Sequence, residues 1–168
     1  MEMIYKAARL EKEIAGALEL AMINEQTLRE LTEDEVFTFR LTACDNQVDR
    51  EGERFTEATL EQLGKLYIGK PVLRDHNWSA ETQTARVYDA HLEKRGDVKR
   101  LVLSCYMVRT ASTADTIAAI EGGILRECSV GCAVEHVNCS ICGADQRKML
   151  CEHWPGRESV SYTHLTLP

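Results

Sequence analysis

A single serine, Ser129, lies in the stretch of this sequence best suited to chemistry. Residues 122–135 read GGILRECSVGCAVE, where two glycines end a predicted helix and a strand begins just before Ser129. Gly131 follows, and a glycine in a strand allows another backbone or a substrate to approach closely. Because a serine is a weak nucleophile without a base, a partner is needed, and His76 in the upstream segment GKPVLRDHNW is the candidate. From these residues alone, a structural strand serine and a loop histidine remain the simpler interpretations.

Three cysteines and a histidine further along the chain have the spacing of a metal site. Cys139 and Cys142 form a C-x2-C pair followed directly by Gly143, and Cys151 and His153 form a C-x-H pair downstream. Thiolates and imidazole suit tetrahedral zinc, and four protein ligands leave no open coordination position. The spacing therefore predicts a structural zinc ion, and the alternative is a surface loop with free thiols.

The composition is that of an acidic, folded domain. The chain has 168 residues, of which 44% are hydrophobic and 28% charged, and its net charge is -7. This length predicts one domain, and the negative charge argues against a nucleic-acid partner. No apolar run approaches the roughly 20 residues that cross a bilayer, so no membrane partner is expected.

Cysteine usage favours a reducing, cytoplasmic setting. There are seven cysteines, an odd number, and three of them cluster in the predicted metal site. This pattern fits a metal site in a reduced compartment better than a framework of disulfides. The remaining four are expected to be buried, inert thiols in strands: Cys44, Cys105, Cys128 and Cys132.

The elements that must position Ser129 and His76 are predicted from hydrophobic periodicity. Residues 7–31 are predicted to form an amphipathic helix, because apolar residues recur at three- and four-residue steps. Residues 36–43 alternate as a strand does, and residues 84–93 and 98–108 are predicted to pair as a hairpin whose second strand is buried on both faces. The other predicted elements are helices at 56–67 (with Thr56 as N-cap) and 113–121, a short extended segment at 71–73, and a strand from about Ser129 to His136.

Several short motifs, in a particular order and spacing, carry a family resemblance. They are DREGERF at 49–55, GKPVL at 69–73 running into Asp75 and His76, ARV at 85–87, IEGGIL at 120–125 and CSVG at 128–131. Over about residues 37–156 the chain resembles the prohead (capsid maturation) proteases of tailed bacteriophages, which share a fold with the herpesvirus assemblins. The block from CSICG to CEHWPG, residues 139–156, is similar to a cysteine-rich insert found in a subset of that family.

The resemblance implies a fold and an activity. The expected fold is α+β, with a largely antiparallel, barrel-like sheet, surrounding helices and a small zinc-knuckle insert. Ser129 would be the nucleophile, and His76 the general base that takes the hydroxyl proton and returns it to the leaving amine. The chain would be a serine endopeptidase that needs no cofactor for catalysis and cleaves itself as well as scaffold and major capsid proteins. It would work in the host cytoplasm, inside the prohead, and a homo-oligomer is compatible with this role.

Two other functions are considered. The first is a non-catalytic, zinc-stabilised structural module of a phage particle, which predicts that Ser129 is buried or lies far from His76. The second is a zinc-dependent hydrolase, which fits less well because Cys139, Cys142, Cys151 and His153 would fill the coordination sphere.

Some assignments stay open at the level of the sequence. Asp89, Glu135 and His153 could each orient His76, but the acidic strand that follows the insert in the family is missing here. The orienting carboxylate therefore need not lie in this chain. The oxyanion donors could be backbone N–H groups near Ser129, or Arg126 or Arg74.

The chain is divided into four parts on these grounds. They are an N-terminal helical arm (1–33), a protease-like domain (34–138), the Cys3His insert (139–157) and a tail (158–168). The segment VSYTHL at 160–165 is what one reading frame of a common sequencing-library transposon end encodes. We therefore interpret the tail as non-native and the gene as truncated, which could leave this fragment inactive; the alternative is a native strand, since Val, Tyr and Thr favour strands.

Overall fold

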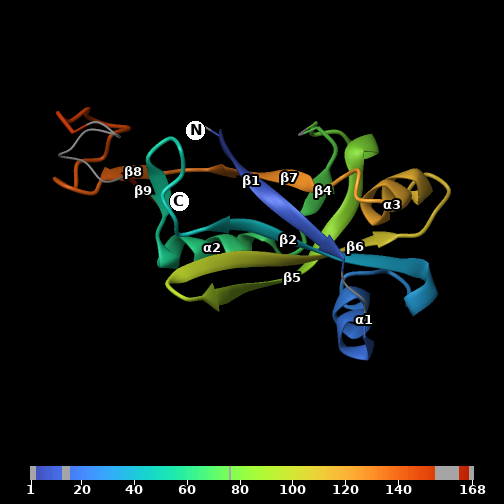
Figure 1. Ribbon diagram of the computed structural model, residues 1–168. Helices are drawn as coiled ribbons and strands as arrows, with labels where there is room; N and C mark the ends of the chain where they lie inside the picture. The colour runs from blue at the N-terminus through green and yellow to red at the C-terminus, as the bar shows by residue number, and fades with distance from the viewer. Residues whose placement is uncertain (1–2, 13–15, 76, 154–162, 167–168) are drawn as a thin grey trace.

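The computed structural model describes residues 3–12, 16–75, 77–153 and 163–166, which form an α+β fold (Figure 1). Its main feature is a six-stranded antiparallel sheet, curled into a half-barrel, with strand order β4-β5-β6-β2-β1-β7. These strands are β1 (Met3–Lys12), β2 (Val36–Asp45), β4 (Pro71–Leu73), β5 (Gln83–Arg95), β6 (Val98–Val108) and β7 (Glu127–Ala133). The expected fold class and antiparallel sheet are confirmed.

Three α-helices and a second, small sheet complete the described part of the chain. The helices are α1 (Ala17–Asn24), α2 (Glu57–Tyr67) and α3 (Ala114–Glu121). The small sheet has the order β3-β9-β8 and consists of β3 (Glu53–Phe55), β8 (His136–Cys139) and β9 (Thr163–Thr166). Two short 3-10 helices, Glu33–Glu35 and Ala80–Thr82, lie in connections. Among the described residues, no helix has the length and apolar character needed to cross a membrane.

The hairpin of β5 and β6 forms the floor of the core. Residues 101–107 of β6 are all buried, as the continuous apolar run predicts. Gly96 makes the turn with a φ of 63°, a backbone conformation that favours glycine. The predicted hairpin is therefore confirmed: β6 has the predicted bounds, and β5 is slightly longer than the predicted 84–93.

Helix α2 packs into the curve of the sheet. Thr56 caps it by accepting a hydrogen bond from the Thr59 amide, as predicted, and Leu60 and Leu63 are buried in the main core. Gly64 allows close approach to the hairpin, because a Cβ there would lie 3.2 Å from Leu101 Cδ1. The same core includes Val130 of β7, so α2 joins the two sides of the half-barrel.

The predicted helix over residues 7–31 is wrong in its first part. Residues Met3–Lys12 form β1, which pairs with β7 through Met3 to Arg9 and with β2 through Arg9 to Lys12. Only α1 keeps the predicted helical structure. Helix propensity is a weak preference, and here two neighbouring strands supply hydrogen-bond partners on both sides of the segment, which decides its conformation. The N-terminal segment thus contributes a strand to the sheet rather than a purely helical arm.

The remaining predicted elements are confirmed within a few residues. They are the helices α2 and α3, the short strand β4, the strand β2 and the Ser129 strand, which the structure divides into β7 and β8. Strand β9 lies in the tail interpreted as non-native, and it pairs parallel to β3 and antiparallel to β8. This pairing is what the alternative of a strand-forming tail predicts, while the origin of the tail stays a prediction.

A hydrogen bond from Tyr67, the last residue of α2, to β7 allows the packing of α2 in the half-barrel to be tested. The Tyr67 hydroxyl donates a hydrogen bond of 3.2 Å to the Gly131 carbonyl in β7. Replacing Tyr67 with Phe removes the donor and leaves that carbonyl without it, so we expect the free energy of unfolding to fall by about 1 kcal/mol. Urea unfolding checks this, with Tyr106→Phe as control, because no hydrogen bond of the Tyr106 hydroxyl is found in the described part of the chain. Equal losses in both variants would contradict the role given to Tyr67.

Candidate active site and metal cluster

Ser129 lies at the middle of β7, on the side away from the core. Val130 and Cys132 are buried, whereas Ser129 is exposed, so the strand alternates as an edge strand over a core does. In the ladder Ser129 is opposite Ala7 of β1, and β7 ends the strand order of the sheet. An exposed hydroxyl on a paired strand is accessible to a substrate and well fixed in position.

The neighbouring thiols are unsuited to act as the nucleophile. Cys128 is half-buried, and burial raises its pKa to about 11, so the thiol stays protonated near neutral pH. Cys44, Cys105 and Cys132 are buried, as expected of inert thiols. Among these side chains, Ser129 is thus the exposed candidate nucleophile.

A turn with a fixed backbone leads from α3 into β7. As predicted, two glycines end the helix: Gly122 is its C-cap, and Gly123 has a φ of 70°. The amides of Ile124 and Leu125 both donate to the Ala119 carbonyl, at 2.8 and 3.1 Å. Beyond the turn, the Leu10 amide of β1 donates to the Arg126 carbonyl at 3.0 Å. The chain is therefore held on both sides before it reaches Ser129.

His76 itself lies outside the described residues, so its expected contact with Ser129 stays a prediction. The residues around it are described. Asp75 has a φ of 53°, a conformation that is uncommon for residues other than glycine but tolerated by aspartate. The Arg74 guanidinium donates a hydrogen bond to the Thr116 hydroxyl of α3. This bond attaches the chain just before His76 to the helix that continues into β7.

The residues that could orient His76 or stabilise an oxyanion make other contacts. The Asp89 carboxylate lies 3.5 Å from the His91 ring, and the exposed Glu135 lies 3.8 Å from the His136 ring. The Arg126 guanidinium lies against Gly123, with Nη2 3.1 Å from the position that a Cβ would occupy. These contacts do not single out one of these residues as the third catalytic residue or as the oxyanion donor.

The four predicted metal ligands come together. One ligand atom each from Cys139, Cys142, Cys151 and His153 lies within 4.8 Å of the others. For comparison, tetrahedral zinc with Zn–S bonds of about 2.3 Å places its ligand atoms about 3.5 to 3.8 Å apart. The Nδ1 atom of His153 is buried and has no hydrogen-bond partner in the described part of the chain, which is costly unless the ring faces a ligand. These residues could hold a metal ion.

The first two candidate ligands, Cys139 and Cys142, lie on a tight, hydrogen-bonded turn. The Gly143 amide donates to the Cys139 carbonyl, the Cys139 amide donates to the Ala144 carbonyl, both at 2.9 Å, and Gly143 has a φ of 74°. Hydrogen bonds from the Cys142 and Ile141 amides lower the pKa of the Cys139 thiol. Since a metal binds the thiolate, this turn favours the ligand form of Cys139.

Hydrogen bonds of Asp145, which the sequence analysis did not predict, connect the loop of the four candidate metal ligands (the metal loop, residues 139–153) to the segment after β7. The Asp145 carboxylate accepts a hydrogen bond of 2.8 Å from the His136 ring and bonds of 3.2 Å from the Val137 and Arg147 amides. The His136 hydrogen bond, more than any other cause, lowers the Asp145 pKa well below its usual range. In addition, the Arg147 guanidinium donates to the Val134 carbonyl, directly after β7. The presence of an aspartate between the C-x2-C and C-x-H pairs was the sequence feature from which these hydrogen bonds could have been predicted.

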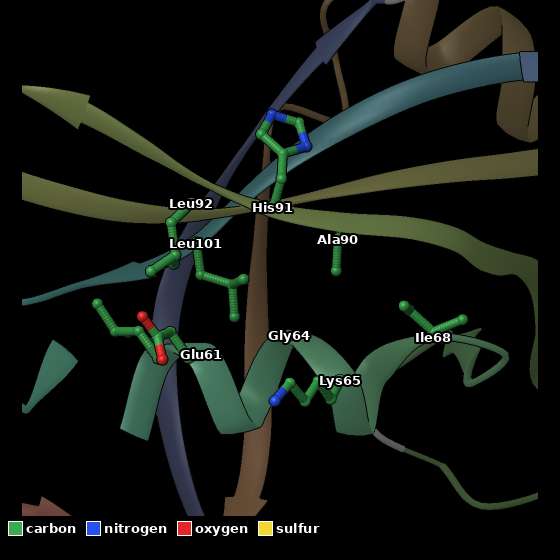
Figure 2. A pocket seen from close by; sticks show the side chains of 9 residues that line it. Glu61, Gly64, Lys65, Ile68, Ala90, His91, Leu92 and Leu101 are labelled. Atoms are coloured by element: carbon green, nitrogen blue, oxygen red, sulfur yellow. The ribbon is translucent and has the colours of Figure 1, made fainter. Parts of the chain in front are cut away.

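A shallow groove of about 220 Å3 lies between α2 and β5 (Figure 2). Ala90 and Leu101 point toward the helix, whereas His91 points to the opposite face of the sheet, where it lies near Asp89 and Glu93. Glu61 and Lys65 stand at the helix side of the groove. Among the described residues, neither Ser129 nor any of the four candidate metal ligands lines it, so the groove is separate from Ser129 and from the metal cluster.

The hydrogen bonds of Asp145 predict that the free energy of unfolding depends on pH. Because the folded-state pKa of this carboxyl is lowered, its contribution to stability is present above the ordinary pKa near 4 and is lost as pH falls further. Asp145→Asn is therefore expected to be less stable than the wild type at pH about 6, with a difference that shrinks below pH about 4. Urea unfolding with a metal chelator present measures this, and Asp97→Asn in the exposed β5–β6 turn is the control. A difference that does not change with pH would contradict the charged interaction.

Comparison of the chain with protein-family models, with curated proteins and with solved structures gave no match in any of the three. The functional interpretation therefore depends on the site geometry and on the motifs around Ser129, His76 and the four metal ligands.

Proposed function

We propose that this protein is a serine endopeptidase of the prohead-protease type, with Ser129 as the nucleophile and His76 as the general base. The observation that carries the proposal is the placement of Ser129, which is exposed on β7. That strand is paired with β1 on one edge and bonded to Tyr67 of α2 on the other. The Tyr67–Gly131 and Arg74–Thr116 hydrogen bonds connect the β4 side of the half-barrel to β7 and to α3. Both support an approach of the His76 segment to Ser129.

The proposed reaction is acyl transfer to the serine. His76 accepts the Ser129 proton as the hydroxyl oxygen attacks a peptide carbonyl, and then returns that proton to the leaving amine. Water hydrolyses the acyl-enzyme in the second half of the reaction. The negative oxygen of the tetrahedral intermediate needs donors that are already oriented, and backbone amides near Ser129 suit this purpose.

The substrates proposed from the family resemblance are scaffold and major capsid proteins, cleaved inside a phage prohead in the host cytoplasm, together with the chain itself. The described part of the chain is compatible with this setting, since it contains no helix able to cross a membrane. The assemblin-like fold is likewise proposed, supported by the curled antiparallel sheet.

The metal ion proposed for the insert is structural zinc. Cys139, Cys142, Cys151 and His153 would hold it, and the donor set of three thiolates and one imidazole suits zinc. Few apolar side chains are buried among the described insert residues, 139–153, so the ion would supply the stability that a small loop cannot obtain from packing. The Asp145 and Arg147 contacts would transmit this order to the end of β7.

A second candidate is the zinc-stabilised structural module without catalysis. The observation that favours it is the metal cluster, which is assembled independently of Ser129. However, this candidate predicts either a buried Ser129 or a distant His76; Ser129 is exposed, and the position of His76 lies outside the described residues. The exposed hydroxyl favours the peptidase.

Loss of the nucleophile is the direct test of the peptidase. The protein is expressed from the full-length gene together with the neighbouring scaffold and capsid proteins. We expect cleaved products, which intact-mass measurement detects. Ser129→Ala should lower the cleavage rate by at least about a thousandfold, because the residual activity of such sites lacks the covalent step. Ser112→Ala, an exposed loop serine, is the control. Unchanged masses in soluble wild-type protein would support the structural module instead.

Metal content is the test of the insert. The purified protein is expected to contain about one zinc ion per chain, and Cys142→Ser should reduce this to near zero, because the exposed Cys142 contributes one of four ligands. Elemental analysis and titration with a colorimetric chelator measure the content. Cys128→Ala, which removes a thiol outside the cluster, should retain the metal. Full metal content in Cys142→Ser would exclude the proposed ligand set.

A further inference from the structure

The three thiols of the metal loop differ in how accessible they are. Cys142 is exposed and Cys151 is half-buried, whereas Cys139 is buried at the end of β8, with 3% of its surface exposed. The Cys139 backbone is also fixed, since its amide donates to the Ala144 carbonyl and its carbonyl accepts from the Gly143 amide. The loop lies at the end of the molecule opposite α3 (Figure 1). A small oxidant in solution therefore reaches Cys142 and Cys151 before it reaches Cys139.

The two accessible sulfurs lie close enough to react with one another. The Sγ atoms of Cys142 and Cys151 are within 4.8 Å of each other. The Gln146 side-chain amide orients the Cys151 sulfur, to which it donates at 3.6 Å. In a disulfide the two sulfurs lie about 2.05 Å apart, whereas two thiolates bound to one zinc ion lie about 3.8 Å apart. Forming the disulfide therefore draws the two ends of segment 142–151 together by roughly 1.5 Å.

The segment between these cysteines is the one that connects the metal loop to the chain after β7. Within it, Asp145 accepts a hydrogen bond of 3.2 Å from the Val137 amide, and the Gln146 amide donates to the Val137 carbonyl at 2.8 Å. The Arg147 guanidinium donates to the Val134 carbonyl. The donor–acceptor distance of such bonds varies over only about 0.5 Å. A displacement of more than an ångström at the ends of the segment therefore breaks contacts that hold Val134 and Val137.

We propose that Cys142 and Cys151 are a hydroperoxide-sensitive thiol pair, whose oxidation to a disulfide expels the metal ion and releases the segment after β7. The inference builds on the proposed metal site and does not depend on cleavage by Ser129. A disulfide removes two of the four candidate ligands, so Cys139 and His153 are left, too few to retain zinc. Thiol reductants reverse the reaction, because they exchange with an exposed disulfide.

The oxidant is hydrogen peroxide, and the reaction takes two steps. The Cys142 thiolate attacks one peroxide oxygen and the O–O bond breaks, which gives a sulfenic acid and a hydroxide ion. The Cys151 thiolate then attacks the Cys142 sulfur and displaces the second oxygen as hydroxide. Protons from solvent convert both hydroxide ions to water. Two thiolates thus lose two electrons in total, and one peroxide is reduced to two water molecules.

Disulfide mapping of the whole chain tests the pair. Protein loaded with zinc and with reduced thiols is treated with hydrogen peroxide, digested and analysed by mass spectrometry, while a colorimetric chelator measures released zinc. We expect a Cys142–Cys151 disulfide, one zinc ion released per disulfide, and reversal by dithiothreitol. The matched control Cys128→Ala should behave as the wild type, and Cys139→Ser should still form the same disulfide. Cys151→Ser should stop at the Cys142 sulfenic acid, which dimedone labels.

Amide hydrogen exchange, followed by NMR, tests the release of the segment after β7. In the oxidised wild type the Val137 amide should exchange about tenfold faster, the effect expected when one ordinary hydrogen bond is lost. The Leu103 amide in the central strand β6 is the control and should exchange at an unchanged rate.

The outcomes decide the two parts of the proposal separately. Absence of a disulfide after peroxide treatment, or a Cys139–Cys142 disulfide in its place, would overturn the pair. An unchanged Val137 exchange rate in fully oxidised protein would overturn the link to the segment after β7. Neither readout needs bound zinc or peptidase activity. Both therefore decide this inference even where metal analysis contradicts the zinc site or Ser129→Ala contradicts the peptidase.

Discussion

The position of Ser129 depends on one pairing, that of β7 with β1. In the described part of the chain, β7 joins the main sheet only through β1, and β1 joins the rest of the sheet through β2. Strand β1 changes partner at Arg9, so its first half holds β7 and its second half holds β2. The candidate nucleophile is therefore positioned by a segment more than a hundred residues earlier in the chain. Any change that weakens β1 should loosen β7 before it disturbs the β5–β6 hairpin.

Helix α2 adds a constraint from inside the curve of the sheet. Its buried leucines lie in the same core as Val130 and Cys132, and Tyr67 reaches the backbone of β7. Gly64 lets the helix approach β6 closely enough for this contact, since a side chain there would meet Leu101. Helix α2, which packs tightly against the β5–β6 hairpin, thus sets the distance between the hairpin and β7.

Much of this fold could be predicted from local patterns. The hairpin, α2 with its Thr56 cap, the glycine stop after α3 and the Ser129 strand follow from periodicity, capping and turn chemistry, and the structure contains all of them. The metal cluster could be predicted because C-x2-C and C-x-H spacing constrains geometry within a short loop. Strand β1 could not, because its residues favour a helix locally and the strand is stabilised by partners distant in sequence. For the same reason, the Tyr67–Gly131 and Arg74–Thr116 contacts carry no signal in the sequence, although Asp145 did offer one.

Strand β7 is held at both of its ends, and this bears on how a serine there could react. At its start, the turn after α3 is fixed by the Ala119 carbonyl and by β1. At its end, Arg147 binds the Val134 carbonyl, and Asp145 binds His136 and the Val137 amide. A nucleophile must be held within a fraction of an ångström of its productive position, because its advantage over a reaction in solution comes from orientation that is already established. The metal loop, although its ligands would take no part in the chemistry, supports one of these two ends. In the proposed function, structural zinc would therefore support catalysis by Ser129 indirectly, because Arg147 and Asp145 connect the loop of the four candidate ligands to the end of β7.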